Sequence, residues 1–244
     1  MPTPEHPMTG RTVLVTGANR GIGYALVEAA LHRGARRVYA GMRNPVDHPD
    51  SRVVTLPLDV TDRAQIKAAA DSLDALDILV NNAGLGTYEE LADRVALESH
   101  LAVNLYGPYD LALVALPLLS ASRGAVVNVL SLAGLAALPV MPAYSISKAA
   151  AHALTQAQRA LFATYGVRVH AALTGPVDTD MTRGLEIPKT SPAAVAQAIY
   201  AGLEANQEDI FPDAMSASLE PAWDTGVIKM LERANSALLP GATV

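Results

Sequence analysis

The sequence predicts an α/β fold with one doubly wound parallel sheet in a single domain. From Arg11 onward, short runs rich in β-branched residues alternate with longer runs rich in Ala and Leu, as in repeated βα units. The chain has 244 residues, of which 50% are hydrophobic and 17% charged, so it holds ample material for a core. Because α/β folds of roughly 200–250 residues often form one domain, we expect a loose tail over residues 1–10 and one domain over residues 11–244.

Strands are expected where apolar residues follow one another almost without interruption, because helices cover both faces of such a sheet. The predicted strands are residues 12–16, 37–40, 53–57, 77–80, 125–130 and 167–171, with a further short strand at 209–211.

The Ala- and Leu-rich runs between the strands are expected to form helices. The first covers residues 22–33 and stops at Gly34, which suits the left-handed conformation that follows a helix. Prolines punctuate the stretch after Gly175, so residues 177–190 are expected to form a mobile loop. The other predicted helices are residues 62–73 with Thr61 as N-cap, 92–119 with an interruption near Gly107 and Pro108, 143–165, 193–205 and 227–238.

Charge and composition argue against several classes of function. The net charge of −6 and the lack of a long basic run argue against a nucleic-acid partner. With no cysteine and six scattered histidines, neither a disulfide nor a metal site is expected. The most apolar stretch, residues 111–119, is far shorter than the roughly 20 residues that cross a bilayer, and residues 1–9 do not resemble a signal peptide. We expect a cytoplasmic protein without a membrane partner.

A tyrosine and a lysine stand four residues apart in the predicted helix 143–165. Residues at this spacing share one face of a helix, so the Tyr144 phenol and the Lys148 ammonium group are expected to project into the same small volume. A phenol ionises near pH ~10, and a neighbouring cation lowers that pKa. The pair therefore predicts Tyr144 as a general acid or base and makes a redox enzyme the leading hypothesis.

A glycine-rich turn follows the first predicted strand and opens the first helix. It reads Thr16-Gly17-Ala18-Asn19-Arg20-Gly21-Ile22-Gly23. Glycines here let backbone amides approach a pyrophosphate at the positive end of the helix dipole, as in dinucleotide-binding Rossmann folds. By itself, such a turn is also compatible with an ordinary strand-to-helix loop.

The end of the second strand favours NADP(H) over NAD(H). An acidic residue at this place usually accepts hydrogen bonds from the adenosine ribose, but the chain reads Tyr39-Ala40-Gly41-Met42-Arg43. Arg20 and Arg43 could instead hold a 2′-phosphate by charge-assisted hydrogen bonds. The alternative is that both arginines are solvated surface charges.

Five elements in one order resemble the short-chain dehydrogenase/reductase family, over about residues 11–179. They are the glycine-rich turn, Asn81-Asn82-Ala83-Gly84, Asn104, Ser131 and Tyr144-x-x-x-Lys148. The resemblance implies that Tyr144 donates a proton to a substrate carbonyl while the nicotinamide delivers hydride. Ser131 would orient and polarise that carbonyl. Lys148 would hold the nicotinamide ribose and lower the pKa of Tyr144, and Asn104 would anchor a water that passes protons from Lys148 to solvent.

The resemblance also implies a set of cofactor-binding residues along the cleft of a single dinucleotide-binding catalytic domain. Asp59 and Val60 would border the adenine, and Val177 and Thr179 would contact the nicotinamide amide. The full implied set is Gly17, Asn19, Arg20, Gly21, Ile22, Gly23, Arg43, Asp59, Val60, Asn81, Ala83, Gly84, Tyr144, Lys148, Gly175, Val177 and Thr179.

The chain departs from the family pattern in two places. Thr174 precedes Gly175 where the family usually has proline, so the nicotinamide loop is expected to follow a different path. The usual seventh strand and glycine-rich ending are not recognisable near the carboxyl end. Because that ending often builds the tetramer interface of the family, a monomer or a dimer is at least as well supported as a larger homo-oligomer.

The leading functional hypothesis is an NADPH-dependent reductase that acts on a ketone or aldehyde, a small-molecule carbonyl substrate. The alternatives are a cofactor-binding sensor or scaffold without turnover, and an alcohol dehydrogenase that works in the oxidative direction. The substrate pocket is expected to be apolar and to draw on Leu85, Leu135, Leu138, Met141, Pro176, Met181 and Leu185.

Overall fold

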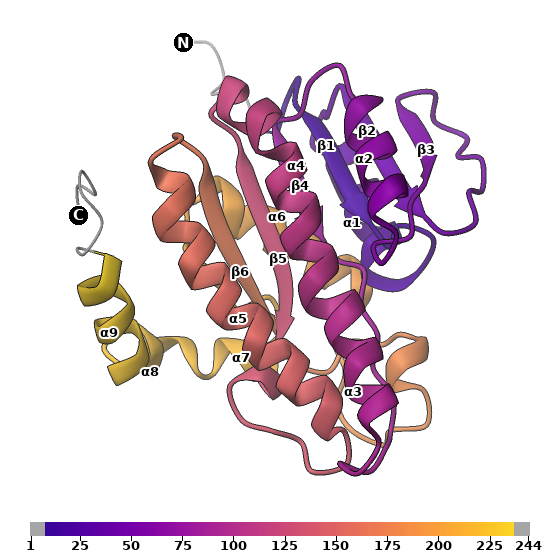
Figure 1. The fold of residues 1–244 in the computed structure, drawn as a ribbon. Helices are drawn as coiled ribbons and strands as arrows, with labels where there is room; N and C mark the ends of the chain where they lie inside the picture. The colour runs from indigo at the N-terminus through magenta and orange to yellow at the C-terminus, as the bar shows by residue number, and fades with distance from the viewer. Residues whose placement is uncertain (1–7, 237–244) are drawn as a thin grey trace.

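The computed structural model describes residues 8–236, which form a parallel sheet with helices on both faces (Figure 1). The described part of the sheet has seven strands in the order β3-β2-β1-β4-β5-β6-β7. The strands are β1 Thr12–Thr16, β2 Arg37–Met42, β3 Val53–Pro57, β4 Ile78–Asn81, β5 Ala125–Ser131, β6 Arg168–Thr174 and β7 Asp209–Ile210.

Helices cover the sheet and connect most successive strands, whereas a loop without a helix joins β2 to β3. The α-helices are α1 Gly21–His32, α2 Arg63–Asp71, α3 Arg94–Leu101, α4 Gly107–Ser122, α5 Pro142–Ala163, α6 Pro192–Glu204, α7 Ala214–Ala217, α8 Glu220–Trp223 and α9 Val227–Ser236. A π-helical turn, η1 Ala102–Tyr106, joins α3 to α4, and two 3₁₀ turns occur at η2 Leu132–Gly134 and η3 Asp180–Thr182.

The order of the strands reverses next to β1, which pairs with β2 on one side and with β4 on the other. Connections on the two sides of this point run in opposite directions across the sheet. A crevice therefore opens at the carboxyl ends of the strands, where open α/β sheets bind their ligands.

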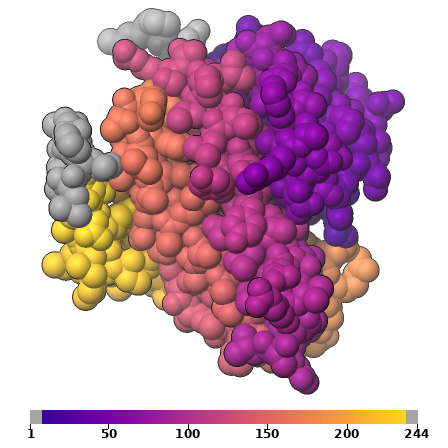
Figure 2. All heavy atoms as spheres, in the orientation of Figure 1, coloured from indigo at the N-terminus to yellow at the C-terminus, as the bar shows by residue number. Residues whose placement is uncertain are grey.

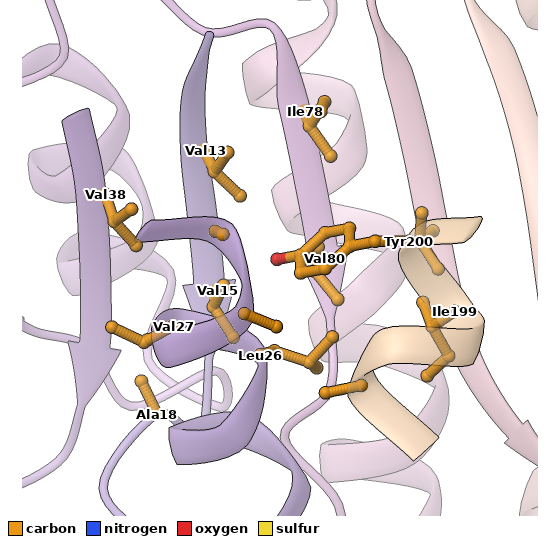
Figure 3. Packing of buried hydrophobic residues seen from close by; sticks show 14 of the residues in the cluster. Val13, Val15, Ala18, Leu26, Val27, Val38, Ile78, Val80, Ile199 and Tyr200 are labelled. Carbon is orange, nitrogen blue, oxygen red and sulfur yellow. The ribbon is translucent and has the colours of Figure 1, made fainter. Parts of the chain in front are cut away.

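Alternate residues of the strands form hydrophobic clusters on the two faces of the sheet, because successive side chains of a strand point to opposite faces. On one face, Val13 and Val15 of β1 pack with Leu26 of α1 and with Ile199 and Tyr200 of α6 (Figure 3). On the other face, the cluster contains Leu14, Leu79 and Val126 of the strands together with residues of α2, α4 and α5. The sheet thus lies between two helical layers, as its apolar runs predict.

The predicted elements are confirmed, with shifts at their ends. The second and sixth predicted strands extend further, to Met42 and Thr174. Asp62, not Thr61, caps α2, because its side chain accepts hydrogen bonds from the backbone amides of Ala64 and Gln65. The predicted helix 227–238 is observed as far as Ser236, and its last two residues lie outside the described residues.

The predicted loose tail is wrong for residues 8–10. Met8 is buried in the core cluster that contains α1 and α6, and the amide of Gly10 donates to the carbonyl of Gly34. This contact fixes the chain just before β1. Residues 1–7 lie outside the described residues.

The helical stretch Arg94–Ser122 is long and apolar enough to cross a membrane by length and composition, which the nine-residue estimate from the sequence missed. Part of its apolar character serves the core, and 33% of the apolar window is buried. Leu111, Ala112, Ala115 and Leu119 are buried in the core on one face of the sheet. Such a face is what a core helix of an α/β fold requires.

The predicted short strand at 209–211 is confirmed as the seventh strand, so the expectation that the usual seventh strand is not recognisable was wrong. β7 pairs in parallel with β6 through Asp209 and Ile210. Beyond it, α8 and α9 lie beside α5 at one side of the molecule (Figures 1 and 2). The inner face of α9 is charged, since Lys229 and Glu232 are buried, whereas Met230 is 61% exposed.

Ion pairs hold α9 in place. Lys229 lies 2.7 Å from Asp209 and 3.1 Å from Glu232, and Arg159 of α5 pairs with both of these carboxylates. The indole of Trp223 also donates to Asp209, at 2.8 Å. A buried pair that loses one partner is strongly destabilising, so this network determines where the C-terminal helices dock.

Candidate active site

A cavity of about 1650 Å³ opens at the carboxyl ends of the strands. Its lining includes the glycine-rich turn, the segments that follow β2, β3, β4, β5 and β6, the first two turns of α5, and residues of α1 and α6. The loop from Val177 to Thr190 forms one wall and is closed at its base by a parallel bridge between these two residues.

The glycine-rich turn is held against β4 by side chains that bind backbone. The Thr16 hydroxyl accepts from the amides of Asn82 and Ala83, at 3.0 and 2.9 Å, and the Asn82 side chain donates to the Thr16 carbonyl at 2.9 Å. A Cβ atom on Gly23 would lie 2.1 Å from the Gly17 carbonyl oxygen. Only glycine therefore allows the first turn of α1 to approach β1 so closely.

The amino end of α1 fits a phosphate group. Gly17 and Gly21 have φ angles of +64° and +54°, and Arg20 at the N-cap position makes no side-chain capping bond. The first backbone amides of a helix have no partner inside the helix, and an anion satisfies them at the positive end of the helix dipole. The residues present therefore fit the diphosphate of a dinucleotide.

Ser131, Tyr144 and Lys148 meet at the wall of the cavity. Ser131 ends β5, and its hydroxyl shares a hydrogen bond with that of Tyr144. The Lys148 ammonium lies 5.9 Å from the centroid of the Tyr144 ring and donates to the Val129 carbonyl at 2.9 Å. The predicted i, i+4 pair therefore shares one face of α5 and faces the cavity.

Three contacts fix the amino end of α5, which carries this pair. The amide of Ala143 donates to the Glu89 carboxylate at 2.7 Å. The Ser145 hydroxyl donates to the Met141 carbonyl and accepts from the amide of Leu138. Tyr144 lies between Ala143 and Ser145, so these contacts hold its backbone in place.

The pKa of Tyr144 is raised above its ordinary value because the side chain is buried, and the hydrogen bond with Ser131 acts in the opposite direction. The prediction that Lys148 lowers the pKa of Tyr144 is therefore wrong. Burial disfavours the charge of Lys148 as well, and it lowers the pKa of this amine from 10.5 to about 8. Tyr144 is accordingly protonated at neutral pH.

The π-helical turn positions Asn104. Its Oδ1 accepts from the amide of Leu85, and its Nδ2 donates to the Leu85 carbonyl and to the Ser147 hydroxyl, all at 2.8 Å. Widened helical turns of this kind occur frequently at functional sites. Here the turn ties the segment after β4 to α5, one residue from Lys148.

The segment after β6 is anchored from two sides. The Thr174 hydroxyl donates to the Leu130 carbonyl at 2.8 Å, so the residue that replaces the usual proline binds the neighbouring strand. The amide of Gly175 donates to Asp213, which precedes α7, at 2.6 Å. The tail after β7 thus supports the wall of the cavity, and Met215 of α7 contributes to the lining.

The two arginines predicted to bind a 2′-phosphate both line the cavity, in different states. Arg43 is exposed. The pKa of Asp59 is lowered chiefly by the hydrogen bond from the Thr61 amide, and the charge of Arg43 contributes to the same shift. Arg20 forms an ion pair with Asp180 of the 177–190 loop, at 2.7 Å.

The structure brings most of the predicted residues together around this one cavity. Asn81 and Asn104 are missing from its lining, because the Asn81 side chain donates to Asn128 of β5 and that of Asn104 binds Leu85 and Ser147. The predicted residues that line the cavity are Gly17, Asn19, Arg20, Gly21, Ile22, Gly23, Arg43, Asp59, Val60, Ala83, Gly84, Ser131, Tyr144, Lys148, Gly175, Val177 and Thr179.

The apolar part of the lining differs from its prediction. Leu135 is missing from it, while Met215 and Ile187 are among the apolar residues that belong to it without having been predicted. Ile187 lies in the loop that was expected to shape the pocket. Nothing near Met215 in the sequence marks it, because its place depends on how the C-terminal helices dock.

Comparisons with known proteins agree with this geometry. The family model for short chain dehydrogenases matches residues 11–189. A short-chain dehydrogenase of Penicillium ochrochloron, ptmH, is 39% identical over 185 residues, which cover 70% of this chain and 68% of that protein. An uncharacterised oxidoreductase of Staphylococcus aureus strain USA300 is 32% identical over 214 residues, 80% of this chain and 92% of its own.

Solved structures resemble the chain over nearly its whole length. A short chain dehydrogenase from Burkholderia cenocepacia J2315, crystallised with NADP, has a TM-score of 0.83 and 35% identity, covering 93% of this chain and 98% of its own. A gluconate 5-dehydrogenase from the same organism, solved with NADP and tartrate, has a TM-score of 0.76 at 23% identity over 88% of this chain and 98% of its own, a likeness of fold alone.

Proposed function

Because the chain belongs to the short-chain dehydrogenase family, we propose that it is an NADP(H)-dependent oxidoreductase that reduces a ketone or an aldehyde to an alcohol. The observation that carries the proposal is the group of Ser131, Tyr144 and Lys148 on the wall of a cavity that begins at a glycine-rich helix terminus.

The cofactor assignment is supported from two directions. A structure with 35% identity contains NADP, and in this chain Arg43 stands at the end of β2 where an NAD site usually has a carboxylate. The amides at the start of α1 would hold the diphosphate, and Lys148 would hold the nicotinamide ribose. When bound, the nicotinamide supplies or accepts the hydride.

The protein supplies the proton and fixes the carbonyl. Tyr144 is protonated at neutral pH and lies beside Ser131, so its hydroxyl donates a proton to the carbonyl oxygen while Ser131 holds that oxygen by a second hydrogen bond. Lys148 is close to its pKa of about 8 and exchanges protons readily near that pH. Asn104 acts on the site indirectly, by holding the Leu85 segment against α5.

The raised pKa of Tyr144 favours reduction over oxidation at neutral pH. Reduction needs a protonated phenol as acid, whereas oxidation of an alcohol needs a phenolate as base. Since burial disfavours the phenolate, the oxidative reaction should require a more alkaline solution.

The substrate end of the cavity favours a neutral, apolar molecule. Met141, Met181 and Met215 line it together with Leu85 and Leu138. Methionine side chains adapt their shape to irregular apolar surfaces. A carbonyl compound with sizeable hydrocarbon groups therefore matches the lining better than a charged one.

A substrate panel tests the proposal. Purified protein is assayed with ketones and aldehydes of increasing size, with NADPH and NADH in parallel, and compared with the Tyr144→Phe variant. We expect NADPH-dependent reduction that Tyr144→Phe lowers by about 10²–10⁴-fold. Tyr165→Phe is the matched control, because Tyr165 is 55% exposed just after the far end of α5.

Two results would count against the proposal. Equal rates for the wild type and Tyr144→Phe would remove Tyr144 from the chemistry. Tight NADPH binding without turnover across the whole panel would favour the alternative function of a cofactor-binding sensor or scaffold.

A further inference from the structure

Arg20 of the glycine-rich turn is held by a carboxylate from the opposite wall of the cavity. Its guanidinium pairs with Asp180 at 2.7 Å, across 160 positions of the sequence. Both side chains remain partly open to solvent, with exposed fractions of 66% and 42%. A group that enters the cavity from solvent therefore has access to this ion pair.

The two walls touch next to this pair. A Cβ atom on Gly21 would lie 3.2 Å from the Thr179 side chain, so the turn and the start of η3 are in van der Waals contact. The position of Asp180 beside Arg20 thus follows from the packing of these two segments.

Asp180 has a second partner of its own. Arg183, one turn further along the loop, pairs with the other carboxylate oxygen. Loss of Arg20 would therefore leave Asp180 with a positive neighbour, which keeps the cost of breaking the first ion pair small.

Arg43 contrasts with Arg20. It lines the same cavity, and no ion pair of Arg43 is seen among residues 8–236. Of the two arginines near the expected 2′-phosphate position, one is ready to bind an anion and the other is occupied by a carboxylate of the protein.

We propose that Asp180 is a specificity-determining residue for the cofactor, because it competes with the 2′-phosphate of NADP(H) for Arg20. This inference rests on the proposed use of NADP(H). A phosphate monoester carries a charge of about −1.5 to −2 at pH 7 and offers three acceptor oxygens, so it attracts Arg20 more strongly than one carboxylate does. NADH lacks this group and leaves the ion pair of Arg20 and Asp180 intact.

The competition has a consequence for affinity. Each NADPH molecule must break an ion pair that NADH does not disturb, so Asp180 reduces the preference for NADPH that Arg20 and Arg43 create. It also links the bound cofactor to the 177–190 loop, since the loop loses one tie to the glycine-rich turn only when a 2′-phosphate is present.

Binding titrations of the Asp180→Asn variant test the inference without any substrate. The dissociation constants of NADPH and NADH are measured by nucleotide fluorescence for the wild type, Asp180→Asn, Arg20→Ala and the double variant. Exposed ion pairs change affinities modestly, so we expect Asp180→Asn to tighten NADPH roughly two- to fivefold and to leave NADH unchanged. In the Arg20→Ala background, Asp180→Asn should change neither constant.

A control isolates the ion pair from the general charge of the loop. Glu186→Gln removes the same charge from an exposed residue of the loop that does not line the cavity, and it should leave the ratio of the two constants unchanged. An equal effect of Glu186→Gln and Asp180→Asn would overturn the inference in favour of long-range electrostatics.

The remaining outcomes separate this inference from the proposed function. If the wild type binds neither nucleotide, the cofactor assignment fails and the inference fails with it. If the wild type prefers NADPH but Asp180→Asn shifts both nucleotides equally, shifts neither, or acts equally in the Arg20→Ala background, only the role of Asp180 is refuted.

Discussion

Replacing Lys148 by methionine should stabilise the protein at neutral pH and should do so less as the pH rises. Lys148 is only 6% exposed, and burial lowers its pKa from 10.5 to about 8. Its charge is therefore disfavoured in the folded state. Methionine has a similar length and no charge, so the variant removes the penalty of burying an ammonium group.

The magnitude follows from the shift in pKa. Below pH 8, Lys148 is protonated in both the folded and the unfolded chain. At pH 7 the lowered pKa of Lys148 therefore reduces the free energy of unfolding by about 3 kcal/mol. Between the two pKa values the unfolded chain binds more protons, so stability rises with pH, and at pH 10 the cost is below about 1 kcal/mol. The lost hydrogen bond to Val129 costs about 1 kcal/mol at every pH.

We therefore expect Lys148→Met to be more stable than the wild type by about 2 kcal/mol at pH 7 and about equal to it at pH 10. Urea denaturation at pH 7, 8.5 and 10 measures the difference. Lys67→Met is the matched control, because the Lys67 side chain is 70% exposed on α2 and pairs with Asp71, so its replacement should give no gain in stability at pH 7. A constant difference for Lys148→Met over the same range would refute the argument from burial.

Three further substitutions test other parts of the structure. Gly23→Ala places a Cβ atom 2.1 Å from the Gly17 carbonyl oxygen, so it should lower the melting temperature and abolish NADPH binding; unchanged fluorescence titrations would contradict the tight turn. Arg159→Leu leaves the carboxylate of Asp209 without one of its cations and should lower the free energy of unfolding by about 3–5 kcal/mol, as measured in urea. Arg43→Ala should weaken NADPH binding about tenfold and spare NADH, and an equal loss for both nucleotides would exclude a 2′-phosphate contact.

The order of the elements could be predicted from the sequence because buried strands in this fold are continuous apolar runs. Their ends could not, since pairing with a neighbour decides how far a strand extends. β6 reaches Thr174 because it pairs with β5 as far as Ser131. The N-cap of α2 could not be predicted either. Asp62 and Thr61 are both suitable residue types for an N-cap, and only the backbone geometry selects Asp62.

The residues of the site were predictable by type and spacing, but their electrostatics were not. The spacing of Tyr144 and Lys148 places both on one face of α5, as expected. It says nothing about how deeply the two groups are buried, and burial dominates the pKa of each. The Arg20 ion pair was hidden for a different reason, because Asp180 lies in a loop whose path depends on tertiary contacts.

Residues far along the chain complete the site in ways that no local pattern reveals. Asp213 follows β7 and binds the Gly175 amide, and Met215 enters the lining two residues later. Glu89 caps the start of α5 from a segment that carries no helix or strand. Each of these contacts depends on the docking of a whole segment.

The inverted polarity of α9 has a practical use in protein engineering. An ordinary surface helix keeps its hydrophobic residues inside, so polar replacements on its outer face gain nothing. Here Val227, Met230 and Leu231 are 71%, 61% and 57% exposed, while the buried residues Lys229 and Glu232 anchor the helix. Glutamate or lysine at the three outer positions would improve solubility and leave the anchoring side untouched. In contrast, replacing the two inner residues by aliphatic ones would detach the helix.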